Sequence, residues 1–327
     1  MRQLILIISF WRLGFSGATQ ELNDSVITIL KNNPNASYTC LGISFDASFA
    51  YYNQALFSPG LQYNLFTPRF AISTSGRLHI WEKISAVKEN QLIVSSIYES
   101  SISRDYLIQA SFFFINRMVS KPMTIDHSSN SLTTSRNHQG SLINVDVNER
   151  IGLDLGFKSG FTYYSFQNFG ALNGISNNGT SYLIYPYLFP PKSISTNYNY
   201  AFFKFGFSYT SVNNLSVKTS KGVTSKNYIF QFYTHLYLPI YNNVDDVYYR
   251  NYNSSTNSYY FVQFDINTNM GYHKFGAAIG INYFECKKWG LGFNLEVGCL
   301  PGPWFSLIDA QYVNLSAKFS LGTFLKK

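Results

Sequence analysis

Two side chains in the first half of the chain are of the types that nucleophilic hydrolases use. His127 and Ser129, with Asn130 beside them, would supply a general base, a nucleophile and an amide that orients the imidazole ring. The surrounding stretch 127–140 is rich in Ser, Asn, Thr and His, so such combinations arise in it by chance. We therefore interpret the stretch as a solvated loop and keep catalysis as a remote alternative.

Residues that hold metals or phosphate groups do not occur in the spacings that such sites need. The five histidines show no HxH or HExxH spacing, and the three cysteines form no CxxC motif. At most one disulfide could form among Cys40, Cys286 and Cys299, and we interpret all three as isolated apolar residues. Asp245-Asp246 is interpreted as an exposed acidic pair, and the glycines follow strand alternation rather than a phosphate-binding loop. We expect no metal and no cofactor.

A third candidate set consists of charged residues that would share the polar face of predicted strands. Inside a barrel they would either line a pore and set its ion preference, or pair with one another across a filled lumen. The predicted lumen-facing residues are Asp46, Asp154, Lys158, Lys204, Lys274, Glu296 and Lys318.

The elements that would position these charges are indicated by a period-two alternation of apolar and polar residues, which is typical of β-strands with one apolar face. The alternation runs through 41–52, 201–210, 274–283, 289–298 and 313–322. Each of these segments has ten residues or more. Globular strands usually have about 5–6 residues, whereas a tilted membrane-spanning strand needs about 9–11. Strand length therefore favours a membrane barrel.

Other segments are less regular. The segment 143–163 keeps its alternation for too long for one bilayer crossing, so we expect a strand that continues beyond the membrane or a hairpin near Asn148-Glu149-Arg150. Further strands are predicted at 60–66, 76–84, 91–98, 105–118, 181–188, 227–240 and 258–268, with long polar loops at 127–140, 165–180, 213–226 and 241–257. Short turns that alternate with long polar loops are typical of outer-membrane barrels.

Composition argues against a helical membrane protein and is unusual for a soluble domain, so a secreted β-sandwich or adhesin stays the alternative to a membrane barrel. Only 13% of the 327 residues are charged, against roughly 25% in soluble proteins. Mean hydropathy is −0.07, and no apolar stretch approaches the ~20 residues of a transmembrane helix. The net charge of +8 is scattered along the chain, unlike a nucleic-acid footprint. We predict an all-β, transmembrane, antiparallel up-and-down barrel of about 14 strands, within a range of 12–16.

Aromatic residues, which make up 18% of the chain, gather at the ends of the predicted strands. Amphipathic rings prefer the membrane–water interface, so this clustering indicates the two aromatic girdles of a barrel. The alternative is that Tyr and Phe are simply good strand formers. The predicted interface aromatics are Tyr51, Tyr163, Tyr259, Tyr283, Trp289 and Trp304.

The N-terminus has the features of a secretory signal, with an early positive charge, a short apolar core and small residues before a cleavage point after Ala18. A buried strand is the alternative. In segment 21–31, Leu22, Val26, Ile29 and Leu30 share one helical face ahead of Pro34, so a short helix is possible there, with a disordered leader as the alternative. We divide the chain into a signal peptide (1–18), a periplasmic segment (19–37) and an outer-membrane β-barrel (38–327).

Several of these segments resemble known families. Four segments resemble Bacteroidota outer-membrane barrels. They are the signal-like start that ends in 17–20, the glycine-rich strands 151–157 and 289–293, and the alternating terminal strand 315–327. That group includes barrel subunits of type IX secretion, gliding and barrel-assembly machines. Asn33-Pro34-Asn35-Ala36 resembles the N-terminal Asn-Pro-Ala stretch of fatty-acid-transporter-like barrels. Residues 127–131 resemble the His-x-Ser-Asn-Gly signature of outer-membrane phospholipase, with Ser131 in place of the glycine.

Three functional hypotheses follow. The first, implied by the Bacteroidota resemblance and by the lack of enzyme motifs, is a non-catalytic accessory or scaffold subunit of an envelope machine. It would lie in the bacterial outer membrane and contact lipid, lipopolysaccharide and protein partners, but not nucleic acid. The second is a passive channel or small-solute porin. The third is a phospholipase-like enzyme that uses His127 and Ser129.

Overall fold

The computed structural model describes residues 27–50, 54–84, 93–95, 103–126, 140–166, 172–176, 181–184, 194–219, 222–244, 247–253, 258–264, 272–303 and 311–325. The predicted signal peptide, with Leu22 and Val26, lies outside the described residues. Regular structure within the described part of the chain consists of strands alone. No helix there is long and apolar enough to cross a membrane.

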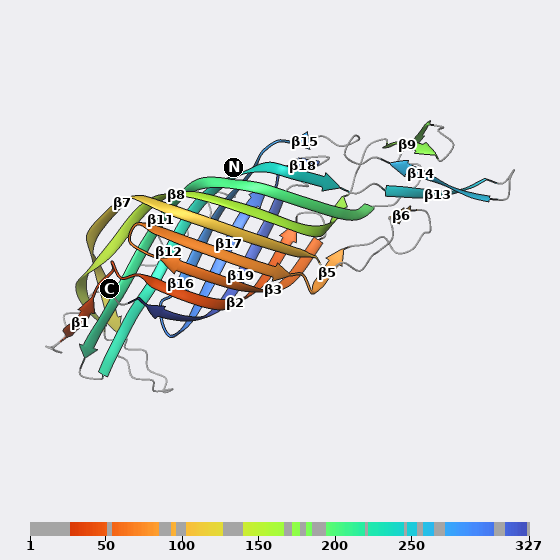
Figure 1. Ribbon diagram of the computed structural model, residues 1–327. Helices are drawn as coiled ribbons and strands as arrows, with labels where there is room; N and C mark the ends of the chain where they lie inside the picture. The colour runs from red at the N-terminus through yellow and green to blue at the C-terminus, as the bar shows by residue number, and fades with distance from the viewer. Residues whose placement is uncertain are drawn as a thin grey trace.

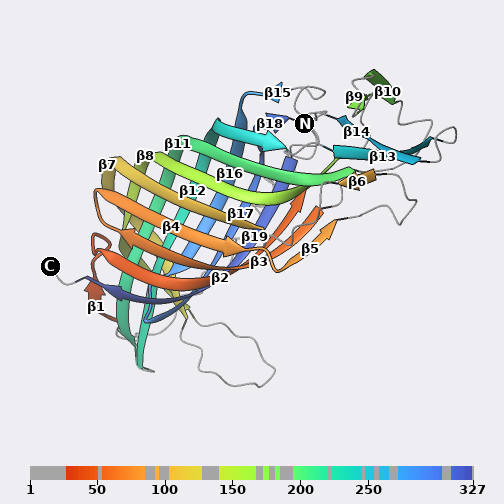
Figure 2. The ribbon, with the colours of Figure 1, turned by 45° about the vertical axis from the view of Figure 1, so that its right-hand side comes forward.

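Ten of the strands close into a barrel (Figures 1 and 2). Neighbours in the ring pair antiparallel, and the pairing of β8 with β11 closes it. In chain order the ring strands are β2 (Tyr38–Ala50), β3 (Gln54–Phe66), β4 (Phe70–Leu78), β7 (Arg104–Asp126), β8 (Gly140–Phe166), β11 (Ile194–Thr219), β12 (Gly222–Val244), β16 (Gly276–Glu285), β17 (Trp289–Cys299) and β19 (Gln311–Phe324).

The remaining strands lie outside this ring. Strand β1 (Thr28–Asn32) pairs with β11, and β5 (Trp81–Ile84) pairs with β3 just beyond β4. A separate sheet contains β10 (Ser181–Ile184), β9 (Leu172–Ser176), β14 (Ser258–Phe264), β13 (Val247–Asn253) and β6 (Ile93–Ser95). Strand β15 (Tyr272–His273) pairs with β18 (Gly302–Pro303).

The all-β antiparallel barrel was predicted correctly, but the number of strands was wrong. The prediction of about 14 counted several segments that do not join the ring, and β8 and β11 are longer than expected, with 27 and 26 residues. Segment 143–163 lies within the single strand β8, and most of the polar segment 213–226, expected as a loop, belongs to β11 and β12. Segments near 181–188 and 258–268 contribute to the separate sheet instead of the ring.

The short helix predicted over 21–31 is also wrong for the residues that the structure describes. Thr28 and Ile29 are β-strand residues that pair with Lys218 and Val217 of β11. Two effects favour the strand. Ile27, Thr28 and Ile29 are consecutive β-branched residues, which prefer extended backbone, and the free edge of β11 offers hydrogen-bond partners to this segment.

The size of the barrel follows from its strand register. Paired residues followed once around the ring from Tyr38 lead back to Ala50, twelve residues farther along β2. With ten strands, about 4.8 Å between strands and about 3.3 Å per residue, this stagger gives a strand tilt of about 40° and a backbone radius of about 10 Å. Side chains that point inward from opposite walls therefore meet near the barrel axis.

The two ends of the barrel differ. At the proximal end β2 begins and β19 ends, and the connections between ring strands include 67–69, 220–221 and 286–288. Most connections at the distal end are longer, including 79–103, 167–193 and 245–275, and these contain the strands of the separate sheet (Figure 1, right). Two connections depart from this pattern, since 51–53 at the distal end is short and 127–139 at the proximal end is long. This asymmetry resembles that of an outer-membrane barrel, whose periplasmic turns are short.

The two faces of the barrel wall also differ, and here the alternation prediction is confirmed. Along β2, the apolar side chains of Leu41, Ile43 and Phe45 are exposed on the outside, whereas Ser44 and Asp46 are buried inside. The same apolar exterior continues over the ring and includes Leu61, Ile108, Phe112, Phe207, Leu236, Ile279, Leu291 and Phe319. A continuous apolar surface of this extent is rare on proteins that are soluble in water.

Four strands of the ring, β7, β8, β11 and β12, extend past its proximal end. Beyond Val212 of β11, where its pairing with β8 ends, β11 pairs with β1 instead. The extended parts of β7, β8 and β11 share a small apolar cluster formed by Ile125, Val145, Val147, Leu215 and Val217. This cluster stabilises the extensions outside the barrel wall.

A close approach at the proximal end yields a test of this packing. Tyr38 donates a hydrogen bond to the carbonyl of Lys287 at 3.1 Å, and its ring lies over Gly322, where an added Cβ would overlap the hydroxyl. We expect Gly322→Ala to destabilise the barrel by about 1–3 kcal/mol through overpacking. The measurement is the temperature at which the folded band is lost in heat-modifiability electrophoresis.

The matched control is Gly76→Ala, because its added Cβ would meet only the Tyr106 ring, at 3.3 Å and beyond. Equal melting temperatures for both variants would show that Tyr38 does not pack on Gly322 as described.

Candidate functional site

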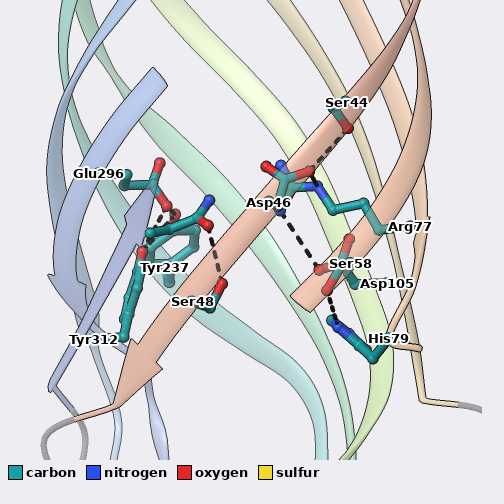
Figure 3. A network of polar contacts seen from close by, with 11 residues as sticks. Ser44, Asp46, Ser48, Ser58, Arg77, His79, Asp105, Tyr237, Glu296 and Tyr312 are labelled. Atoms are coloured by element: carbon teal, nitrogen blue, oxygen red, sulfur yellow. Dashed lines mark hydrogen bonds and ion pairs between the residues drawn. The ribbon is translucent and has the colours of Figure 1, made fainter. Parts of the chain in front are cut away.

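The lumen contains a network of paired charges (Figure 3). Arg77 lies between two carboxylates, with its Nε 3.2 Å from Asp46 and its Nη1 3.7 Å from Asp105. Ser44 Oγ donates to Asp46 at 2.8 Å, and Ser58 Oγ lies 2.5 Å from His79 Nδ1. These groups come from β2, β3, β4, the segment after β4, and β7. The network therefore ties adjacent parts of the wall together.

A second network surrounds Glu296. Its carboxylate accepts hydrogen bonds from the hydroxyls of Tyr312 at 2.7 Å, Tyr233 at 2.8 Å and Tyr237 at 3.3 Å. The Lys204 ammonium lies 5.4 Å from the Tyr233 ring centre and 6.0 Å from that of Tyr237. Hydrogen bonds to an ionised carboxylate are stronger than neutral ones, so these contacts hold the three tyrosines in place.

A third group joins β8, β11 and β12. Asp154 accepts from Ser208 Oγ at 2.8 Å, and its other oxygen lies 2.8 Å from His235 Nε2. All three side chains are buried. Because both oxygens of Asp154 are occupied, this carboxylate holds three strands together rather than facing open space.

Between these networks lies a cavity of about 90 Å³. That volume has room for a few water molecules. Its lining is polar and charged, and includes Gln62, Ser75, Arg77, Asp105, Gln109, Lys158, Lys204, Asn282, Glu296 and Lys318.

The proximal end of the lumen is filled by apolar side chains. Tyr38, Cys40, Phe66, Ala71, Val212, Ile229, Phe284 and Cys286 form one buried cluster, with Phe113 packed against it. The three cysteine thiols of the chain are free. We call this group the proximal cluster.

Arg150 lies at the same end and is 1% exposed. Its guanidinium donates to Asn148 Oδ1 at 2.8 Å, to the Thr67 carbonyl at 2.6 Å and to the Pro34 carbonyl at 3.2 Å. The neighbouring Asn35 accepts a hydrogen bond from Asn148. Arg150 therefore fixes segment 33–36 against the proximal end of the barrel.

The distal part of the lumen is narrowed by aromatic rings from β11 and β12. The Tyr198 and Tyr200 ring centres lie 5.2 Å apart, those of Tyr200 and Phe202 lie 4.9 Å apart, and Phe202 is 6.1 Å from Tyr237. All four residues are buried. We call them the distal aromatic cluster.

A cluster of charges lies on the outer face, just beyond the apolar band at the proximal rim. Glu149 is bound by Lys121 Nζ at 2.6 Å, by Arg117 Nη2 at 2.7 Å and by the Tyr209 hydroxyl at 2.8 Å. Hydrogen bonds from Lys121, then Tyr209 and Arg117, hold the pKa of Glu149 at about 2, below its ordinary 4.5. The same pairing raises the pKa of Lys121.

Six of the seven predicted lumen-facing residues lie on the inner side of the ring. Lys158, Lys204, Glu296 and Lys318 line the cavity, while Asp46 and Asp154 are buried in the wall networks. Lys274 is different: it is exposed and precedes the first residue of β16. The apolar–polar alternation in the sequence extends back to Lys274, but the paired strand β16 begins only at Gly276.

The other predicted residues are only partly described. Trp289 is 75% exposed at the start of β17, and Tyr283 is half-buried near the end of β16, so both lie near the proximal rim. Tyr163 and Tyr259 belong to β8 and β14. Tyr51, Trp304 and the catalytic candidates His127 and Ser129 lie outside the described residues.

Sequence reasoning missed several residues of the lumen. Arg150 was placed in a possible turn, and Arg77, Asp105 and His235 lie in strands whose alternation is weaker. Side chains alternate between the two faces of a strand. Because Asp154 points into the lumen, Arg150, four residues earlier in β8, is on the same face, and this signal would have placed it inside. No group of three or more His, Cys, Asp or Glu side chains that could hold a metal occurs among the described residues.

A search of family models gave no match, and no curated protein matches the chain. The solved NanC porin shares 7% identity at a TM-score of 0.28, over 85% of this chain and 98% of that one. A mutant TodX, named as a monoaromatic hydrocarbon channel, shares 10% at 0.24, over 89% and 91%. OpdQ of Pseudomonas aeruginosa shares 9% at 0.17, over 89% and 99%. TM-scores this low establish no relationship, and the resemblance to Bacteroidota barrels stays a prediction.

The Glu149 cluster yields a pH prediction. Because its pKa is lowered from 4.5 to about 2, the stabilisation is fully present above about pH 4.5 and is lost as pH falls through about 2. We expect Glu149→Gln to destabilise the protein by about 1 kcal/mol at neutral pH, allowing for the exposure of Arg117 and Lys121. Thermal melting of both proteins in detergent between pH 7 and pH 2 measures this difference, which should shrink below pH 4.5.

Glu285→Gln is the control, because its partner Lys287, at 3.3 Å, is largely exposed, and such pairs contribute little. A stability difference for Glu149→Gln that stays constant down to pH 2 would contradict the assignment.

Proposed function

We propose that this chain is a bacterial outer-membrane β-barrel whose lumen is a channel for small polar solutes, held closed in the conformation described. The observation that carries the proposal is a polar, charged cavity inside a closed ring whose outer face is apolar. A scaffold barrel needs only a filled interior, whereas a cavity lined by charged side chains offers solutes a place to lose part of their hydration shell.

The membrane placement rests on the outer surface. In hydrocarbon every backbone polar group must pair internally, and closing the ring through β8 and β11 achieves this. Leu61, Phe112 and Phe207 are among the apolar side chains exposed on the outside. At the proximal rim the band gives way to Glu149, Arg117 and Lys121, whose charges suit the headgroup region.

The closed state rests on both ends of the lumen. The proximal cluster and segment 33–36, fixed by Arg150, fill the proximal end, and the distal aromatic cluster narrows the other end. Arg150 donates to carbonyls of two separate segments, at Pro34 and Thr67. A solute that crosses the barrel must therefore displace the contact between Arg150 and segment 33–36.

The proposed orientation places the short proximal connections in the periplasm and the long distal connections outside the cell. It is tested by labelling single cysteines with a large, impermeant maleimide, in a background where Cys40, Cys286 and Cys299 are replaced by serine. Lys274 at the distal side and Lys287 at the proximal side are both exposed. We expect Lys274→Cys to be labelled on intact cells and Lys287→Cys only after the outer membrane is permeabilised. The reverse pattern would place the short connections outside the cell and overturn the orientation.

Channel function is tested by conductance in planar bilayers. We expect the unmodified protein to be closed most of the time. Arg150→Met keeps the side-chain volume but removes the donors to Pro34 and Thr67, so we expect its open probability to rise roughly tenfold, as a loss of about 1.4 kcal/mol would give. Arg117→Met, on the outer face, is the control and should behave like the unmodified protein.

A silent Arg150→Met variant with the circular dichroism of a folded barrel would contradict the channel proposal. No feature of the described residues favours the subunit or the phospholipase hypothesis over the channel.

A further inference from the structure

The cavity in the lumen carries an excess of positive charge. Its lining includes four cationic side chains, Arg77, Lys158, Lys204 and Lys318, but only two carboxylates, Asp105 and Glu296. Asp46 does not line the cavity, but it pairs with Arg77 at 3.2 Å and so reduces the excess to one positive charge. The remaining lumen carboxylate, Asp154, belongs to the network with Ser208 and His235.

The two lining carboxylates are already engaged by other groups. Glu296 accepts three tyrosine hydroxyls, the shortest at 2.7 Å from Tyr312. Asp105 lies 3.7 Å from Arg77 Nη1. Neither carboxylate lies within ion-pair distance of a cavity lysine among the described residues. The lysines are therefore not neutralised by direct pairing.

The three lysines keep unused hydrogen-bond donors. An ammonium group has three donors, yet within the described part of the chain Lys204 has one acceptor, Gln109 Oε1 at 2.9 Å, and Lys318 has one, Asn282 Oδ1 at 2.9 Å. Lys158 lies 5.9 Å from the Tyr312 ring centre and meets no hydrogen-bond acceptor in the described part of the chain. Its N–H donors are therefore available to a ligand.

Neutral donors of the lining are unused as well. Gln62 is 6% exposed, and neither its Nε2 nor Ser75 Oγ has a hydrogen-bond partner among the residues that the structure describes. Both residues line the same cavity as the lysines. A buried amide nitrogen without an acceptor is costly, and together with the unused ammonium donors it specifies a ligand rich in acceptors and negative in charge.

We propose that this cavity is a binding site for a small oxyanion, a carboxylate or phosphate group, held by Lys158, Lys204 and Lys318 with Gln62 as a neutral donor. The volume of about 90 Å³ holds several water molecules, so a group of the size of formate or inorganic phosphate fits in it. Charge-assisted hydrogen bonds from several donors favour oxyanions over neutral solutes. Selection of anions by the channel, the second part of the inference, rests on the proposed function.

The site itself is tested by equilibrium dialysis of the purified barrel against ³²P-orthophosphate and, separately, ¹⁴C-formate, at constant ionic strength in sodium chloride. We expect one site per chain that binds at least one of the two probes. Lys158→Gln should weaken binding at least tenfold, whereas Lys274→Gln, outside the lumen, should leave it unchanged. Lys318→Gln serves as the second variant if Lys158→Gln does not fold.

The two probes distinguish phosphate from carboxylate as the natural ligand chemistry. Absence of saturable binding for both, with the cavity holding water only, overturns the inference, as does equal weakening by Lys274→Gln.

Anion selection is tested apart from binding, by the reversal potential of the Arg150→Met variant in a tenfold potassium phosphate gradient. A reversal potential with the sign expected for an anion-selective channel, and a smaller value in the Lys158→Gln variant, would support anion selection. A reversal potential with the sign expected for a cation-selective channel would refute it. Saturable binding without any conductance would leave the site standing and remove the channel, so the two failures are distinguishable.

Discussion

The closure of the sheet between β8 and β11 is the constraint on which the rest of the structure depends. A backbone in lipid has no water to satisfy its donors and acceptors, so the ring must close. Once ten strands close with a stagger of twelve residues, the radius is set at about 10 Å. The lumen, its cavity and the fillers at both ends are consequences of that radius.

A lumen of this size brings side chains of non-adjacent strands within reach of one another, and Lys158 of β8 lies 5.9 Å from the ring centre of Tyr312 on β19, directly across the ring. Tyr233 and Tyr237 on β12 therefore reach Glu296 on β17, with β16 lying between those strands in the ring. The same closeness lets Lys204 on β11 reach Gln109 on β7 across β8. A wider barrel would have left these groups in water, where such pairs contribute little. Here they hold a rigid polar wall around a small cavity.

The alternation in the sequence was enough to predict the barrel and the inner position of Asp46, Asp154 and Glu296, because period two reports directly which face a side chain takes. It did not reveal the strand number, since periodicity carries no information on which strands close the ring and which form a separate sheet. Segment 213–226 is rich in polar residues for a different reason: it lies where β11 and β12 extend beyond the apolar band. Lys274 is exposed and lies before the first paired residue of β16, so the alternation of that strand does not determine its position.

Arg150 shows why the site could not be predicted in full. Its role depends on Pro34, Thr67 and Asn148, which are distant in the chain and meet only when the ring is closed. The carbonyls that it binds belong to segments without strand partners at those points, so a buried donor is needed there. An arginine can serve several carbonyls at once because its guanidinium has five donors in a fixed plane. A single side chain thus joins the segment before β2 to the turn after β3, and its removal would leave the first held by Asn148 and Asn214 and the second by Asn116.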